Sequence, residues 1–200
     1  MKRIVILISG RGSNMEAIVQ RCAQEGWPAR VVAVVANRPQ AAGLSFAAAQ
    51  GIATAVVDHR AYGERARFDE ALAEVIDGFA PDLVVLAGFM RVLTDGFVRR
   101  YEGRLLNIHP SLLPAFPGLA AWKQALAYGV KVAGCTVHFV DEGIDSGPVI
   151  VQRSVPVRDD DTPDSLHARI QTEEHQAYPE ALRLLAAGRL RIDGRRVICA

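Results

Sequence analysis

The chain has 200 residues, 50% of them hydrophobic, and its formal net charge at pH 7 is +1. This length and composition allow one domain with a sizeable core, whereas the near-neutral charge argues against electrostatic binding to nucleic acid or to a membrane surface. The apolar run near the N-terminus covers only residues 4–8, which is too short for a signal peptide or a membrane span.

Strand-like and helix-like segments alternate along the first half of the chain. Residues 4–8 form a continuous apolar run, which is typical of a strand buried on both faces. Further strand-like segments lie at residues 31–36, 53–57, 83–87 and 105–108. Segments with a helical pattern lie between them, at residues 14–25, 41–50 and 67–79. This alternation predicts an α/β fold with a doubly wound, mostly parallel sheet.

The pattern changes in the second half. Residues 132–140 and 149–157 alternate and are joined by a short glycine-rich loop, which predicts an antiparallel pair of strands. Residues 163–187 predict one long helix that ends at Gly188. Residues 190–198 predict a final strand or hairpin. We therefore predict a single domain with an antiparallel C-terminal part.

Cysteine usage indicates a reducing compartment. Cys22, Cys135 and Cys199 are odd in number and far apart, and their spacing does not match a metal site. We expect three free thiols in a cytoplasmic protein without a bound metal.

A glycine-rich loop follows the first predicted strand. Gly12 lets the backbone approach a ligand closely, and the amides at the start of the next helix favour an anion, with Ser13 and Asn14 as further donors. An ordinary βα turn with a helix cap explains the same residues equally well. A dinucleotide site fits poorly, because the third glycine is absent and Asn37 stands where an acidic residue is needed.

The segment from Asn107 to Pro114 carries the clearest chemical pattern. In an extended strand, residues i and i+2 point to the same side, so Asn107 and His109 would project together into one site. An amide can donate to a developing oxyanion, and an imidazole can carry a proton. Asp145, in a later glycine-rich loop, could orient His109 or take the proton. Together they point to group transfer, although each alone could be a strand cap, a structural histidine or a turn residue.

Four motifs resemble the phosphoribosylglycinamide formyltransferases, the folate-dependent enzymes of purine biosynthesis within the formyl-folate transferase superfamily. They lie, in the family's order and spacing, at residues 9–14, 86–91, 107–114 and 137–148. The resemblance implies a Rossmann-like formyltransferase fold and transfer of a formyl group from 10-formyltetrahydrofolate, as co-substrate, to the amine of glycinamide ribonucleotide. It also implies that Asn107, His109 and Asp145 are catalytic, without a metal. His138 is expected to be a hydrogen-bonded scaffold residue.

The resemblance further implies two sets of binding residues. The ribonucleotide is expected at Gly12, Ser13, Asn14, Gln171, Thr172, Glu173 and Glu174. Formyl-folate is expected at Arg65, Met90, Arg91, Val92, Leu93, Asp141, Glu142, Gly143 and Ile144. Within one domain of residues 1–200, residues 1–103 would mainly bind the ribonucleotide phosphate, and residues 104–200 would form mainly the catalytic and folate-binding half.

Three alternatives compete with this function. A methionyl-tRNA formyltransferase would need a further C-terminal domain and a basic surface, and a formyl-folate hydrolase usually carries an additional N-terminal domain, so both are disfavoured. A non-catalytic nucleotide-binding module would need only the first loop and has no use for a proton relay. We expect small-molecule substrates, no nucleic acid or membrane partner, and a monomer or weak homodimer.

Overall fold

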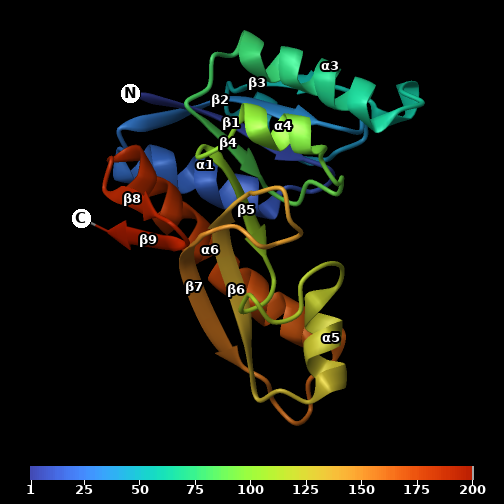
Figure 1. Ribbon diagram of the computed structural model, residues 1–200, viewed down its shortest axis with the longest axis vertical. Helices are drawn as coiled ribbons and strands as arrows, with labels where there is room; N and C mark the ends of the chain where they lie inside the picture. Colours follow the sequence, from blue (N-terminus) through green and yellow to red (C-terminus); the bar gives the residue numbers. More distant parts are fainter. Residues whose placement is uncertain (200) are drawn as a thin grey trace. The chain divides into compact units, whose positions relative to one another are not determined.

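The computed structural model describes residues 1–199 (Figure 1). The chain forms two compact units, Met1–Leu106 and Asn107–Ala200. The described residues form nine strands, six α-helices and one short 3-10 helix. The predicted α/β fold, parallel in its first part and antiparallel in its C-terminal part, is confirmed. The predicted division of a single domain between residues 103 and 104 stays a prediction.

Four parallel strands form the sheet of the first unit, in the order β3-β2-β1-β4. They are β1 (Lys2–Ile8), β2 (Ala29–Ala36), β3 (Ala53–Val56) and β4 (Leu83–Leu86). Residues 4–8 are fully buried, as a continuous apolar run predicts for a strand covered on both faces. The loop after β1 therefore starts from a rigid, buried strand.

The helices of the first unit are α1 (Ser13–Glu25), α2 (Gly43–Ala49), α3 (Arg65–Gly78) and α4 (Asp95–Arg100), with a 3-10 helix, η1, at His59–Ala61. The first three closely match the predicted helices, but α4 was not predicted. The side chain of Thr94 caps α4 by accepting from the amide of Phe97 at 3.3 Å. Six residues with an internal glycine give too little periodicity for a prediction.

The strands of the second unit are mainly antiparallel. β5 (Leu105–His109) enters this unit at Asn107. β6 (Val132–Phe139) and β7 (Val149–Pro156) pair antiparallel, as predicted, with a register shift between Val137 and His138. The predicted terminal hairpin consists of β8 (Leu190–Asp193) and β9 (Arg196–Cys199), and β9 also pairs with β7.

Two helices complete the second unit. The long helix α6 (Pro163–Ala186) was predicted and runs beside β6 and β7 (Figure 1). It begins with a capping box formed by Thr162 and Ser165. It ends where Gly188, with φ of 68°, adopts the left-handed conformation that closes many helices. The short helix α5 (Ala121–Tyr128) was not predicted.

Candidate active site

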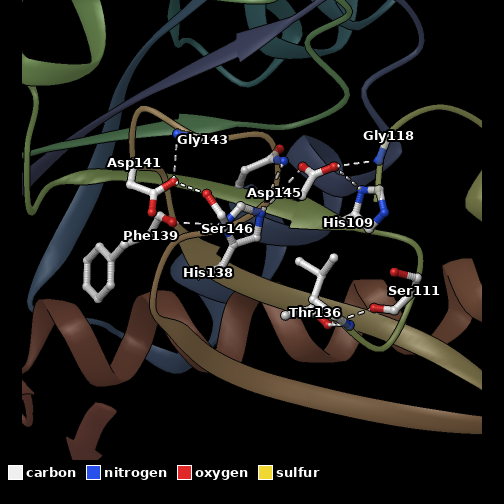
Figure 2. Close-up of polar contacts among 12 residues, drawn as sticks. His109, Ser111, Gly118, Thr136, His138, Phe139, Asp141, Gly143, Asp145 and Ser146 are labelled. Carbon is white, nitrogen blue, oxygen red and sulfur yellow. Dashed lines mark hydrogen bonds and ion pairs between the residues drawn. The ribbon is translucent and has the colours of Figure 1, made fainter. Parts of the chain in front are cut away.

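The end of β5 carries an amide and an imidazole on the same side of the strand. Asn107 and His109 are two residues apart within β5, so the strand's alternation places both side chains on one face. His109 is 5% exposed, and its Nδ1 lies 3.3 Å from Oδ2 of Asp145 (Figure 2). All three predicted catalytic residues thus lie in the second unit, and two of them form an ion pair when the imidazole is protonated.

Backbone groups that follow β5 contact both members of this pair. The carbonyl oxygen of Phe116 lies 2.8 Å from Nε2 of His109, and the amide of Gly118 donates to Oδ2 of Asp145 at 2.8 Å (Figure 2). A carbonyl can only accept, so Nε2 of His109 carries a hydrogen. An imidazole protonated at both nitrogens can donate to Phe116 and Asp145 together, which holds the ring in one orientation.

The loop after β6 presents Asp145 through tight local contacts. Asp145 has a left-handed backbone, with φ of 49°, which Asp and Asn tolerate better than most residues. Oδ1 of Asp141 accepts from the amide of Gly143 at 3.1 Å and from Oγ of Ser146 at 2.6 Å (Figure 2). A Cβ at Gly147 would lie 1.8 Å from a carbonyl oxygen of β6, so only glycine fits there. These contacts define the path of the loop on both sides of Asp145.

The same loop carries the predicted folate contacts of the second unit. Glu142 and Gly143 are exposed, and Ile144 is 72% exposed. Asp141 is half-buried, because its carboxylate is bonded within the loop. An exposed isoleucine on a fixed loop offers apolar surface to a flat ring.

A second histidine adjoins the candidate catalytic residues. His138, near the end of β6, is 2% exposed, and its Nδ1 lies 2.8 Å from the carbonyl oxygen of Phe139 (Figure 2). Its Nε2 lies 3.5 Å from Nδ2 of Asn107 and 3.9 Å from Oδ1 of Asp145. Burial lowers the pKa of His138, and the nearby negative charge of Asp145 opposes this shift only in part. The contact with two candidate catalytic side chains goes beyond the expected scaffold role.

Two polar side chains hold the segment that follows β5. Thr136, fully buried on β6, donates to the carbonyl of Ser111 at 2.7 Å and accepts from the amide of Leu113 at 3.1 Å (Figure 2). Gln152 on β7 donates to the carbonyl of Leu113 at 2.9 Å. The Leu113–Pro114 peptide bond is cis. Sequence reasoning missed Thr136 and Gln152, because single polar residues in strands carry no chemical pattern.

The predicted folate loop after β4 is held at both ends within the first unit. The amide of Met90 donates to Oγ of buried Ser9 at 2.7 Å, and the amide of Thr94 donates to Oδ2 of buried Asp69 at 2.6 Å. Between these anchors, Met90 and Val92 are 63% and 64% exposed. The loop therefore combines a fixed backbone with exposed apolar side chains, a combination that suits a flat ring with polar edges.

The two arginines predicted near the folate have different surroundings. Arg65, the first residue of α3, is exposed. Arg91 is half-buried, and its guanidinium lies 5.5 Å from the centroid of the Phe68 ring, which is within the range of a cation–π contact. Leu93 in the same loop is also half-buried. Arg65 is therefore the more accessible of the two for an anionic group.

The first loop of the chain keeps the backbone geometry of an anion site. Gly12 precedes α1 with φ of 75°, and a Cβ there would lie 3.1 Å from the side chain of Met15. Because Gly12 has no side chain, it cannot form the side-chain hydrogen bond that caps many helices. Ser13 is half-buried and Asn14 is buried at the helix start, where backbone amides favour negative charge.

The four ribonucleotide candidates on α6 differ in their surroundings. Glu174 is 5% exposed, so it does not lie on a solvated helix face. Glu173 forms an ion pair of 3.4 Å with an arginine of β7, Thr172 donates to a carbonyl one turn earlier at 3.2 Å, and Gln171 is half-buried.

Burial, and secondarily the charge of Glu174, raises the pKa of Cys135 to about 12.

In the part of the chain that spans residues 1–199, no three His, Cys, Asp or Glu side chains gather as a metal site would require. No helix of the same part combines the length and the apolar character needed to cross a membrane.

Comparison with known proteins gives consistent matches along the chain. The family model described as formyl transferase matches residues 2–182. Phosphoribosylglycinamide formyltransferase of Escherichia coli is 47% identical over 97% of this chain and 95% of that protein. The crystal structure of glycinamide ribonucleotide transformylase 1 from Symbiobacterium toebii is 52% identical, with a TM-score of 0.97 over 100% of this chain and 94% of that one.

Other relatives are much longer proteins. The trifunctional purine biosynthetic protein adenosine-3 of Bos taurus is 46% identical over 98% of this chain. The chain spans only 20% of the length of that relative.

Proposed function

The chain belongs to the formyl transferase family, and from this premise we propose that it transfers the formyl group of 10-formyltetrahydrofolate to the amine of glycinamide ribonucleotide. The products are formylglycinamide ribonucleotide and tetrahydrofolate, and the reaction is a step of de novo purine biosynthesis. The observation that carries this proposal is the His109–Asp145 pair, 3.3 Å apart, beside Asn107 at the end of β5.

The three side chains meet the demands of formyl transfer. The amine nitrogen attacks the formyl carbon, the bond from that carbon to the folate nitrogen breaks, and one proton passes from the attacking to the leaving nitrogen. We assign Asn107 to donate to the formyl oxygen as negative charge develops there. His109 carries the proton, and Asp145 orients His109 and balances its charge.

The contact between His109 and Phe116 belongs, in this proposal, to the resting enzyme. Nε2 of His109 donates to the Phe116 carbonyl at 2.8 Å, which keeps the ring aligned with Asp145. A substrate nitrogen would take the place of that carbonyl when the proton moves. His109 is 5% exposed, which limits competition from water.

The binding residues remain assignments by family resemblance, supported by their local geometry. The left-handed Gly12 at the start of α1 suits the ribonucleotide phosphate, together with Ser13 and Asn14. The residues assigned to the ribonucleotide on α6 are Gln171, Thr172, Glu173 and Glu174. Exposed apolar side chains support folate binding at two loops, whose assigned residues, with Arg65, are Met90, Arg91, Val92, Leu93, Asp141, Glu142, Gly143 and Ile144.

We further propose a monomer or weak homodimer that acts in the cytoplasm on these small-molecule substrates. All three cysteines are free thiols, which fits a reducing compartment. Light scattering coupled to size-exclusion chromatography measures the oligomeric state, and a stable tetramer or larger assembly would contradict this part.

A labelled formyl group tests the reaction directly. The purified chain is mixed with 10-formyltetrahydrofolate labelled in the formyl carbon and with glycinamide ribonucleotide, and the nucleotide product is analysed by mass spectrometry. The expected result is label in formylglycinamide ribonucleotide, and its loss in His109→Ala. Release of free formate independent of the ribonucleotide would indicate a hydrolase. Label in methionyl-tRNA, offered in a parallel reaction in place of the ribonucleotide, would indicate the tRNA enzyme. Nucleotide binding without any reaction would indicate a binding module.

A further inference from the structure

His138 lies at a point where the strand is irregular. The pairing of β6 with β7 shifts register between Val137 and His138, and such an irregularity re-aims the side chain that follows it. His138 is 2% exposed and sits beside Asp145 (Figure 2). The reaction steps assigned to Asn107, His109 and Asp145 do not use this buried imidazole.

The hydrogen-bond partners of His138 fix its tautomer. Nδ1 lies 2.8 Å from the carbonyl oxygen of Phe139, and a carbonyl can only accept, so Nδ1 carries a hydrogen. Burial disfavours the charged ring and lowers the pKa of His138. A neutral ring with its hydrogen on Nδ1 has a lone pair on Nε2, which can only accept.

This lone pair decides which way the Asn107 amide points. Nε2 of His138 is 3.5 Å from Nδ2 of Asn107. The reverse orientation would set the amide oxygen of Asn107 against the lone pair, and two acceptors repel each other. One N–H of Asn107 is thereby held by His138, and the second N–H of the same nitrogen is left to donate elsewhere.

We infer that His138 is a positioning residue for formyl transfer: its unprotonated Nε2 orients the Asn107 amide so that the amide nitrogen, and not the oxygen, is presented to the formyl oxygen. This assignment rests on the proposed function of Asn107. It gives the register shift between β6 and β7 a role in the reaction, because β6 delivers the acceptor that orients the amide.

The charges around His138 explain why the ring must stay neutral. Asp145 lies 3.9 Å from Nε2 and favours protonation of His138, as Asp141 does more weakly, whereas His109 opposes it. A proton on Nε2 would turn His138 into a second cationic partner for Asp145, in competition with His109. It would also force the Asn107 amide to reverse. Burial prevents both effects.

Three variants of His138 separate orientation from packing. His138→Asn keeps a short amide near the Phe139 carbonyl but has no acceptor at the position of Nε2, whereas the carbonyl of His138→Gln can reach that position. His138→Leu has neither group. His59→Asn is the matched control, because His59 also contacts a backbone carbonyl through Nδ1, at 2.8 Å, but lies in the first unit.

The kinetic test measures kcat and both KM values for these variants. Losing an oxyanion donor costs about 10²–10³ in kcat, so misorienting one in His138→Asn or His138→Leu should cost roughly 10- to 100-fold. Both KM values should stay within about twofold, His138→Gln should retain most of the turnover, and His59→Asn should match the wild type. Equal losses in the Asn and Gln variants would overturn the assignment, as would a change in KM alone.

Two further measurements test the assignment, and the first of them needs no variant. Nitrogen NMR of the wild type should show His138 neutral, with its hydrogen on Nδ1, at neutral pH; a hydrogen on Nε2 or a charged ring would overturn the assignment. In an Asn107→Ala background, His138→Asn should cost almost nothing further, and additive losses would contradict the coupling. If the wild type formylates no ribonucleotide, the proposed function fails. The NMR result would still decide whether the His138 ring is neutral with its hydrogen on Nδ1.

Discussion

Replacing Asp145 with asparagine removes one negative charge while leaving the loop free to keep its shape. Asn tolerates the left-handed backbone, with φ of 49°, that Asp145 adopts. The side-chain oxygen of Asn can still accept from the amide of Gly118, which lies 2.8 Å from Asp145 Oδ2. The substitution therefore tests the charge that faces Nδ1 of His109 at 3.3 Å.

The expected loss follows from this one contact. A hydrogen bond to a charged group contributes about 1.5–3 kcal/mol, and each 1.36 kcal/mol of barrier changes the rate tenfold. Asp145→Asn should then lower kcat by roughly 10- to 150-fold. The KM for formyl-folate should change less, because the backbone of the loop is retained.

The assay measures kcat and KM for both substrates across pH, with Asp159→Asn as control. Asp159 pairs with Lys131 at 3.1 Å on the surface, where both side chains are mostly exposed, so its charge should contribute little. Turnover of Asp145→Asn within about twofold of the wild type, with an unchanged pH profile, would reduce Asp145 to a turn residue. Asn107 and His109 would then have to carry the reaction alone.

Three further outcomes are expected. Gly12→Val forces a β-branched residue into a left-handed position (φ of 75°) and should raise the KM for glycinamide ribonucleotide about tenfold or more, with little change for folate; equal rises for both substrates would indicate misfolding instead. A thiol reagent at mildly alkaline pH should modify exposed Cys199 in the native protein, and Cys22 and Cys135 only after unfolding, because burial raises the pKa of both and that of Cys135 to about 12; fast modification of all three thiols would contradict this. The depressed pKa of His138 means that the unfolded chain binds more protons below the unfolded value of about 6.5, so the free energy of unfolding should fall as pH drops from there towards the folded value. His138→Gln should show a shallower fall in denaturant titrations, and identical slopes would refute the burial argument.

Local pattern was sufficient for most of the fold. A continuous apolar run predicted the buried strand β1, further strand-like segments predicted the other parallel strands of the first unit, and alternation predicted the antiparallel pair β6 and β7. These predictions succeed because the period of a strand depends on its own residues. Gly188 predicted the end of α6 through its left-handed conformation. The short helices α4 and α5 escaped prediction, since six and eight residues give little periodicity.

In the candidate site, too, local spacing predicted some features, and only the tertiary structure decided the others. The spacing of Asn107 and His109 in one strand predicted that they share a face, which the period of two requires. The distance of 3.3 Å from His109 to Asp145 and the contact of His138 with Asn107 join residues far apart in the sequence. The partners Phe116 and Gly118 contribute backbone groups, which every residue carries, so no sequence pattern marks them. Tertiary structure decided these contacts, because the register shift between β6 and β7 and the turns after β5 bring the separate segments within hydrogen-bond distance.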